Sequence, residues 1–200
     1  MSYRGVRHQV SHAEQIAAFT GLIAPLGVQV HRAASIAAAA DTLRELAAEL
    51  VVSQVLVSSE LLEVFPGLSD ELADRGLDLV LAGDPAHSRD APLGLTTARN
   101  AIAETGSLLM SEATLANRSV SMLSLVLAVV LPSSVMLSNL DDASRVLRAE
   151  ARKPGGAYTT LVTGPSRTAD IELSLTVGVQ GPGRVIVIFV DGDPAQEGNH

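Results

Sequence analysis

Short apolar runs alternate with helical patterns through the first 82 residues, and this alternation constrains the fold more than any other feature. Residues 28–30, 54–57 and 78–82 are segments of strand length, whereas residues 13–26 and 35–50 carry apolar side chains at helical spacing and residues 70–75 form a further helical turn. A β-α-β-α-β order predicts a parallel sheet, because each helix returns the chain to the same edge. We therefore predict an α/β fold with three layers, a mostly parallel sheet and helices on both faces.

The remaining apolar segments extend this pattern. Strands are expected within residues 102–110, 125–131, 158–163 and 184–190, and a helix over residues 139–151. The polar loop at 83–93 contains two prolines and is expected to be the most mobile part of the chain.

Composition restricts both the core and the partners. Hydrophobic residues make up 47% of the chain but aromatic residues only 2%, so the core must consist of Ala, Val, Leu and Ile. The net charge of −8 argues against a nucleic-acid partner and against attraction to anionic lipid. The chain has no cysteine, which excludes disulfides, thiolate metal sites, a cysteine nucleophile and a thiolate-bound iron–sulfur cluster of its own.

The length of 200 residues fits one domain. We expect residues 1–191 to form it and residues 192–200 to be a disordered tail. No apolar h-region follows the charged N-terminus, so no signal peptide is expected. The longest apolar stretch, residues 122–131, is about half of what a membrane-spanning helix needs. The expectation is a cytoplasmic protein without membrane insertion.

A Gly-Pro turn at residues 164–172 is the first candidate site. It follows the apolar run 158–163 and is expected to open a helix, which would aim free N–H groups and a favourable dipole at an anion. Ser166, Arg167 and Thr168 would then bind the anion, with Arg167 as a bidentate donor. The alternative is that these residues only cap the helix.

Glu104 is the second candidate, because it is a carboxylate inside an otherwise apolar run and next to a Thr-Gly turn. Partial burial would raise its pKa and suit it to act as an acid, a base or a nucleophile. The alternative is a residue at a strand edge that bonds a backbone N–H, Arg99 or Arg118. Asp170 is a further candidate, since it is close enough in sequence to orient Arg167.

Other motifs give no support for a metal or a bound cofactor, and we expect neither. His8 and His12 have metal-compatible spacing but no third ligand. The glycines at residues 178–183 precede a strand, so they favour a helix C-cap and a turn over a dinucleotide fingerprint.

Three segments together resemble the LUD domain family, the lactate-utilisation proteins of bacterial operons. The resemblance spans about residues 50–191 and is carried by Gly94-Leu95-Thr96 with residues 103–107, by Arg118, by Gly-Pro-Ser-Arg-Thr-Ala-Asp-Ile-Glu at 164–172, and by Gly178 with Gly181-Pro182. The short chain without cysteine looks like the C type. The family's fold is similar to that of the glucosamine-phosphate isomerase, ribose-phosphate isomerase and CoA-transferase superfamily.

The resemblance implies a role in oxidising L-lactate to pyruvate with iron–sulfur partner proteins. The ligand expected from the residues of the Gly-Pro turn is a small anionic metabolite. The positions it adds to the expected ligand-binding set are Thr96, Thr105, Gly106, Arg118, Gly164 and Gln180.

Three positions differ from the family pattern. Gln180 and Leu127 stand where relatives commonly have histidine, and Ser124 where they commonly have proline. Glutamine does not titrate and leucine does not hydrogen-bond, so any proton transfer by those histidines would be lost here. This favours an accessory, non-catalytic component with an anion pocket. The alternatives are a stand-alone isomerase or CoA-transferase-like enzyme that uses Glu104, and a metabolite-binding regulatory sensor.

Overall fold

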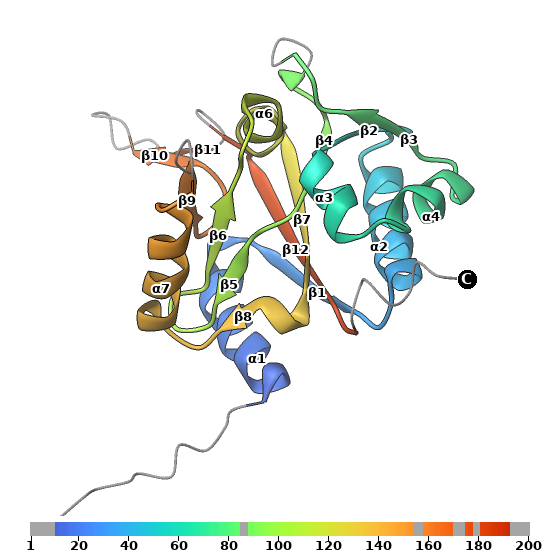
Figure 1. The fold of residues 1–200 in the computed structure, drawn as a ribbon. Coiled ribbons are helices and arrows are strands. Elements are labelled where there is room, and N and C mark those ends of the chain that lie inside the picture. The colour runs from blue at the N-terminus through green and yellow to red at the C-terminus, as the bar shows by residue number, and fades with distance from the viewer. Residues whose placement is uncertain (1–10, 85–87, 154–157, 170–174, 178–180, 193–200) are drawn as a thin grey trace, which may run out of the picture.

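A six-stranded parallel sheet forms the centre of the molecule (Figure 1). The computed structural model describes residues 11–84, 88–153, 158–169, 175–177 and 181–192. The strand order is β1-β12-β7-β4-β2-β3, and every neighbouring pair runs parallel. The strands are β1 (Gln29–Ala33), β2 (Gln54–Val57), β3 (Asp78–Leu81), β4 (Leu93–Thr96), β7 (Val126–Pro132) and β12 (Arg184–Val190).

Three helices cover one face of this sheet. They are α2 (Ile36–Glu49), α3 (Ser59–Val64) and α4 (Leu68–Asp74). Leu43, Leu61 and Leu72 project from them into a core that is completed by alternate residues of the parallel strands, such as Ala128 in β7 and Ile188 in β12. Serine starts two of these helices: the hydroxyls of Ser35 and Ser58 accept the backbone N–H groups of Ala38 and Leu61.

The opposite face carries helices and a second sheet. Helices α1 (His12–Ile23) and α6 (Leu115–Leu123) contribute Phe19 and Val120 to a separate core on this side. The second sheet has the order β8-β5-β6-β9. Its strands are β5 (Asn100–Ile102), β6 (Ser107–Ser111), β8 (Met136–Leu137) and β9 (Thr159–Val162), and α7 (Leu140–Glu150) follows β8. The three-layer α/β prediction is confirmed, and the second sheet adds to it.

Two short 3-10 turns complete this half, η1 (Ala24–Leu26) after α1 and η2 (Ser133–Val135) after β7. The edge-to-face rings of Phe19 and Phe189, 5.5 Å apart between centroids, join α1 to β12.

The prediction of a helix after the Gly-Pro turn is wrong. Residues 167–169 form strand β10 (Arg167–Ala169), which pairs antiparallel with β11 (Leu175–Val177). Residues 168 and 176 are register partners in this backbone ladder, and threonine is a residue type that favours strands. The helix-dipole argument for an anion site at Ser166–Thr168 therefore does not hold.

Strands β2 and β4 are neighbours whose onward connections leave in opposite directions. After β2 the chain passes through α3 and α4 to β3 on one side, whereas the strand beside β4 on the other side is β7. Such a switch point leaves a crevice outside the carboxyl ends of the two strands, where open α/β sheets bind ligands.

Val51 occupies a strained backbone conformation between α2 and β2. Its φ is 57° and 90% of the residue is exposed. A β-branched side chain in the left-handed region costs about 1–2 kcal/mol. We expect Val51→Gly to raise the free energy of unfolding by about 1 kcal/mol, measured by urea denaturation. Val51→Ala keeps the left-handed penalty and serves as the control; equal stabilities of the two variants would contradict the prediction.

Candidate functional site

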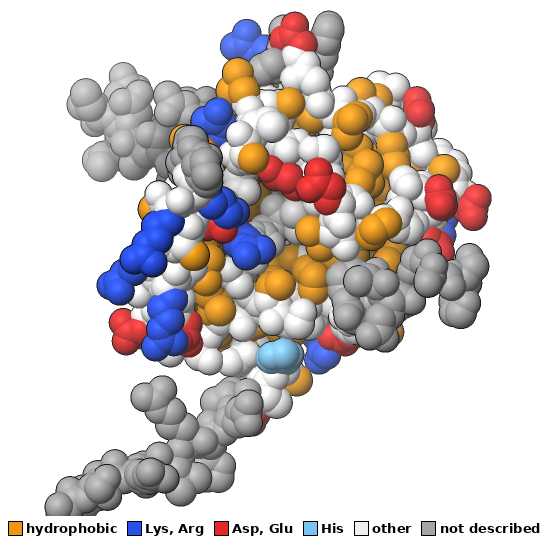
Figure 2. Space-filling view, in the orientation of Figure 1, with side chains coloured by type: hydrophobic (Ala, Val, Ile, Leu, Met, Phe, Trp, Pro, Cys, Tyr) orange, Lys and Arg blue, Asp and Glu red, His pale blue; other side chains and the backbone are white. Residues whose placement is uncertain are grey.

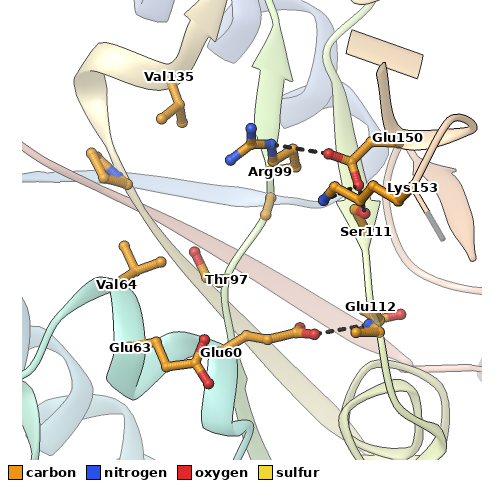
Figure 3. Close-up of a pocket in the computed structure, with 13 residues that line it drawn as sticks. Glu60, Glu63, Val64, Thr97, Arg99, Ser111, Glu112, Val135, Glu150 and Lys153 are labelled. Carbon is orange, nitrogen blue, oxygen red and sulfur yellow. Dashed lines mark hydrogen bonds and ion pairs between the residues drawn. The ribbon is translucent and has the colours of Figure 1, made fainter. Parts of the chain in front are cut away.

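A cavity of about 330 Å³ lies at the crevice between β2 and β4 (Figure 3). We call it the α3–α7 cavity. Its walls come from α3, the segment after β4, the end of β6, the end of β7, and the C-terminal end of α7. The residues that line it are Glu60, Glu63, Val64, Thr97, Ala98, Arg99, Ser111, Glu112, Ala113, Pro132, Val135, Glu150 and Lys153.

A buried carboxylate organises one wall of the α3–α7 cavity. The side chain of Glu150, the last residue of α7, is only 2% exposed. It accepts a hydrogen bond from the Ser111 hydroxyl at 2.8 Å and pairs with Lys153 Nζ at 2.6 Å and Arg99 Nε at 3.5 Å. Burial acts to raise the pKa of Glu150, but the bonds from Lys153 and Ser111 outweigh it and the pKa lies below its usual value.

The facing wall is acidic. Glu60 and Glu63 project from α3, and Glu60 Oε1 accepts the backbone N–H of Ala113 at 2.9 Å. In the space-filling view, acidic side chains gather over α3, and basic side chains gather along and beside α7 (Figure 2). Figure 3 shows the Arg99 and Lys153 head groups on one side of the hollow and the two glutamates on the other.

Glu112 is the most perturbed acid of the described residues. It is 2% exposed, and its Oε1 has no hydrogen-bond partner in the described part of the chain. Its N–H bonds Tyr158 O, which continues the β6–β9 ladder by one residue. Glu112 also borders the α3–α7 cavity, and the groups that act on its carboxyl come from both α6 and α3. Burial raises the pKa of Glu112 to about 7; Glu60 adds to this, and Ser121 and Arg118 oppose it.

The end of β4 positions α3. Thr96 is fully buried, and its hydroxyl donates to Ser58 Oγ at 3.2 Å. Ser58 in turn caps α3 and donates its N–H to Leu95 O. Asn117 of α6 exchanges hydrogen bonds with Ser59. Thr96, expected to bind ligand, thus lies beneath the cavity as a support, whereas its neighbour Thr97 lines the cavity.

Glu104 is not partly buried as expected. It is exposed in the turn between β5 and β6, and its Oε2 accepts the N–H of Leu140 at 2.8 Å, at the first turn of α7. The expectation of partial burial was wrong because the Thr-Gly turn leaves the side chain of Glu104 exposed to solvent. The alternative of a backbone N–H partner is confirmed, and this contact stabilises the helix start.

Thr105 and Gly106 lie in the same turn, packed on the end of α1. Gly106 has a φ of 64°, and a Cβ there would lie 3.0 Å from Leu22 Cβ. Backbone conformation and this close approach both require glycine at position 106. Next to it, the Ser107 and Thr163 hydroxyls are hydrogen-bonded at 2.8 Å, so the structure brings the Thr105-Gly106 turn beside the Gly-Pro turn.

Gly164, Ser166 and Arg167 line a second cavity of about 350 Å³, which we call the loop cavity. Leu127, Gly181 and Pro182 also line it, at the amino ends of β7 and β12, so it lies at the edge of the main sheet opposite to the α3–α7 cavity. The guanidinium of Arg167 donates to the carbonyl of Leu26. Arg118 stacks over the ring of Tyr158, another residue of this cavity, at 4.5 Å from its centroid.

Three candidates remain: Thr168, Asp170 and Gln180. Thr168 pairs with Thr176 through its backbone in β10–β11. Asp170 and Gln180 lie outside the described residues.

Sequence reasoning missed Arg99, Glu112, Glu150 and Lys153. The sequence could have pointed to Glu112, because this carboxylate directly follows the apolar run of β6. Glu104 was singled out for the same reason, since it follows the apolar run of β5. Glu150 and Lys153 have the pattern of ordinary residues at the end of a polar helix. In the folded protein Glu150 is buried, and Ser111 of β6 donates a hydrogen bond to it. No helix among the described residues is long and apolar enough to cross a membrane.

The model of the LUD domain family matches residues 16–190. The chain belongs to the LUD domain family. Two curated relatives are lactate utilization protein C 1 of Bacillus mycoides, 33% identical over 110 residues, and lactate utilization protein C of Macrococcus caseolyticus, 30% identical over 153 residues. The first match covers 54% of this chain and 47% of the relative, the second 70% and 66%. These relatives confirm the resemblance to the C type.

The chain spans about half the length of most of the curated relatives that it matches. A crystal structure of a DUF162 family protein from Deinococcus radiodurans has the same fold, with a TM-score of 0.64 and 20% sequence identity. That match covers 92% of this chain and 99% of the other.

Proposed function

We propose that this LUD-family protein is an accessory component of bacterial L-lactate utilisation, acting beside iron–sulfur proteins that oxidise L-lactate to pyruvate. The family match and the names of the relatives support the lactate-utilisation role. The chain has no cysteine for a thiolate-bound cluster, so the partners would carry the electrons.

The protein would bind a small anionic metabolite in the α3–α7 cavity. One observation carries this part of the proposal: a buried glutamate holds two cations, Arg99 and Lys153, at a crevice where α/β sheets bind ligands. The Gly-Pro turn is a weaker candidate for the anion, because Arg167 already donates to a backbone carbonyl and no helix begins at Ser166.

No contact of Glu104 favours the alternative of a stand-alone isomerase or CoA-transferase-like enzyme. Glu104 is exposed, and its carboxylate holds the start of α7. If it has only this role, a glutamine in its place, which keeps an acceptor oxygen, would leave any activity unchanged.

Reconstitution of L-lactate oxidation tests the accessory role. Pyruvate formation would be measured from L-lactate with the iron–sulfur partners, with and without this protein. We expect the rate to fall when the protein is omitted and to return when it is added back. An unchanged rate on omission would refute the proposed function.

A further inference from the structure

The α3–α7 cavity presents opposite charges on its two walls. Arg99 and Lys153 stand on one wall, with side chains 60% and 57% exposed, and Glu60 and Glu63 stand on the other. No ion pair within 4.0 Å connects the two walls among the residues that the structure describes. The walls are therefore free to bind two different groups of one ligand.

The basic wall suits a carboxylate. Two cations share one carboxylate, that of Glu150, so the wall keeps a net positive charge. Arg99 turns its Nε toward Glu150, and in the described part of the chain its Nη groups have no hydrogen bond. Glu150 itself is held by Ser111, so the cations are positioned before any ligand arrives. A guanidinium held in this way can donate in parallel to both oxygens of a ligand carboxylate.

The rest of the cavity suits hydroxyl groups. Thr97 Oγ1 is buried and has no hydrogen-bond partner among the described residues, and Figure 3 shows it between the two walls. The carboxylates of Glu60 and Glu63 accept hydrogen bonds but cannot donate them. A hydroxyl can donate to a glutamate and accept from Thr97, whereas a second ligand carboxylate would be repelled by the acidic wall.

We propose that the α3–α7 cavity binds a hydroxy acid, with the carboxylate on Arg99 and Lys153 and a hydroxyl group toward Thr97 and Glu60. This inference rests on the proposed function and deepens it, because L-lactate is the shortest chiral member of this class. A longer polyhydroxy acid such as D-gluconate presents the same carboxylate and hydroxyl groups, so the test compares it with L-lactate.

Isothermal titration calorimetry with the full chain measures the binding of four probes: L-lactate, D-gluconate, propionate and glycerol. Propionate lacks the hydroxyl of L-lactate, and glycerol lacks the carboxylate. We expect a hydroxy acid to bind about tenfold or more tightly than propionate, and glycerol not to bind. The tighter of L-lactate and D-gluconate identifies the length of the ligand. Equal affinity for L-lactate and propionate, with no binding of D-gluconate, would overturn the inference.

Variants separate ligand contacts from folding. Arg99→Gln is expected to weaken binding of the hydroxy acid by about tenfold or more, because a charge-assisted hydrogen bond is lost. Arg148→Gln removes the same charge from the exposed surface of α7, away from the cavity, and should leave affinity unchanged. Equal effects of the two substitutions would overturn the inference. If Arg99→Gln does not fold, Arg99→Lys keeps the charge and tests the loss of the bidentate donor.

Thr97→Val tests the hydroxyl half of the site. It removes an unpartnered buried oxygen without changing the shape of the side chain, so we expect folding to be kept. The variant should bind L-lactate and propionate with similar affinity, while its affinity for propionate stays that of the wild type. Unchanged discrimination would exclude Thr97 and overturn this half of the site. If no hydroxy acid binds but omission still stops lactate oxidation, the site is refuted and the proposed function survives.

Discussion

Replacing Glu112 with glutamine is expected to stabilise the protein at alkaline pH relative to acidic pH. The unfolded chain ionises this carboxyl near 4.5, and burial in the folded protein raises its pKa to about 7. The folded state therefore binds the proton more tightly, and its stability falls as pH rises through this range. Glutamine imitates the protonated acid at every pH, so the variant escapes the loss.

Urea denaturation at pH 5 and pH 8 measures this effect. The wild type should lose about 2 to 3 kcal/mol of unfolding free energy relative to Glu112→Gln between the two values. The comparison across pH cancels any constant cost of the substitution, such as an altered contact with Ser121. Parallel profiles for wild type and Glu112→Gln would show that Glu112 has no raised pKa.

Replacing Gly94 with alanine is expected to destabilise the protein by about 3 kcal/mol. Gly94 lies in β4 beneath the end of α6, and a Cβ there would lie 2.1 Å from Ser124 Oγ and 2.8 Å from Ser124 Cβ. Both partners are buried, so β4 and α6 would have to separate. Thermal or urea unfolding of the variant measures the loss.

A second substitution tests the cause of this loss. Ser124→Gly removes both atoms that the new Cβ would meet most closely, and the Ser124 hydroxyl has no partner among the described residues. We expect Gly94→Ala with Ser124→Gly to recover most of the stability, which gives a large coupling energy in a double-mutant cycle. Gly21→Ala is the control: the added Cβ would meet no atom within 4 Å outside the backbone of its own helix, so this variant should be neutral or stabilising. Simple additivity of the Gly94 and Ser124 effects would contradict this explanation.

The Gly94 contact also explains part of the family resemblance. Gly94-Leu95-Thr96 was expected to contribute a ligand residue, and instead Gly94 lets α6 approach β4 while Thr96 supports the cap of α3. The side chains of this part of the chain that line the α3–α7 cavity come from the next three positions, Thr97, Ala98 and Arg99.

The central strands were predictable because they are buried on both faces. Residues 54–57 and 184–190 form β2 and β12 with the expected bounds, since a parallel strand covered on both sides is a continuous apolar run. Helix α6 was not predicted, and its last two residues lie within the longest apolar stretch, residues 122–131. The helix ends at Leu123 and β7 begins at Val126.

The candidate site was much less predictable than the sheet. The signal at Glu104 was its apolar neighbourhood in the sequence, but the turn exposes that side chain. Glu112 ends an apolar run and Glu150 ends a polar helix, yet both are almost fully buried. Burial of a charged side chain depends on what packs against it from distant parts of the chain, which local patterns do not contain.

The sequence by itself determined the alternation of strands and helices, the parallel sheet and the family, because each depends on local periodicity or on a contiguous motif. Only the tertiary structure decided that the Gly-Pro turn leads into a strand, that Glu104 stabilises a helix, and that Arg99, Glu150 and Lys153 meet. The Arg99–Glu150 pair joins residues far apart in the sequence and exists only because α7 docks its last turn beside β5 and β6. Its formation is a consequence of packing between layers, and packing is what local sequence patterns leave open.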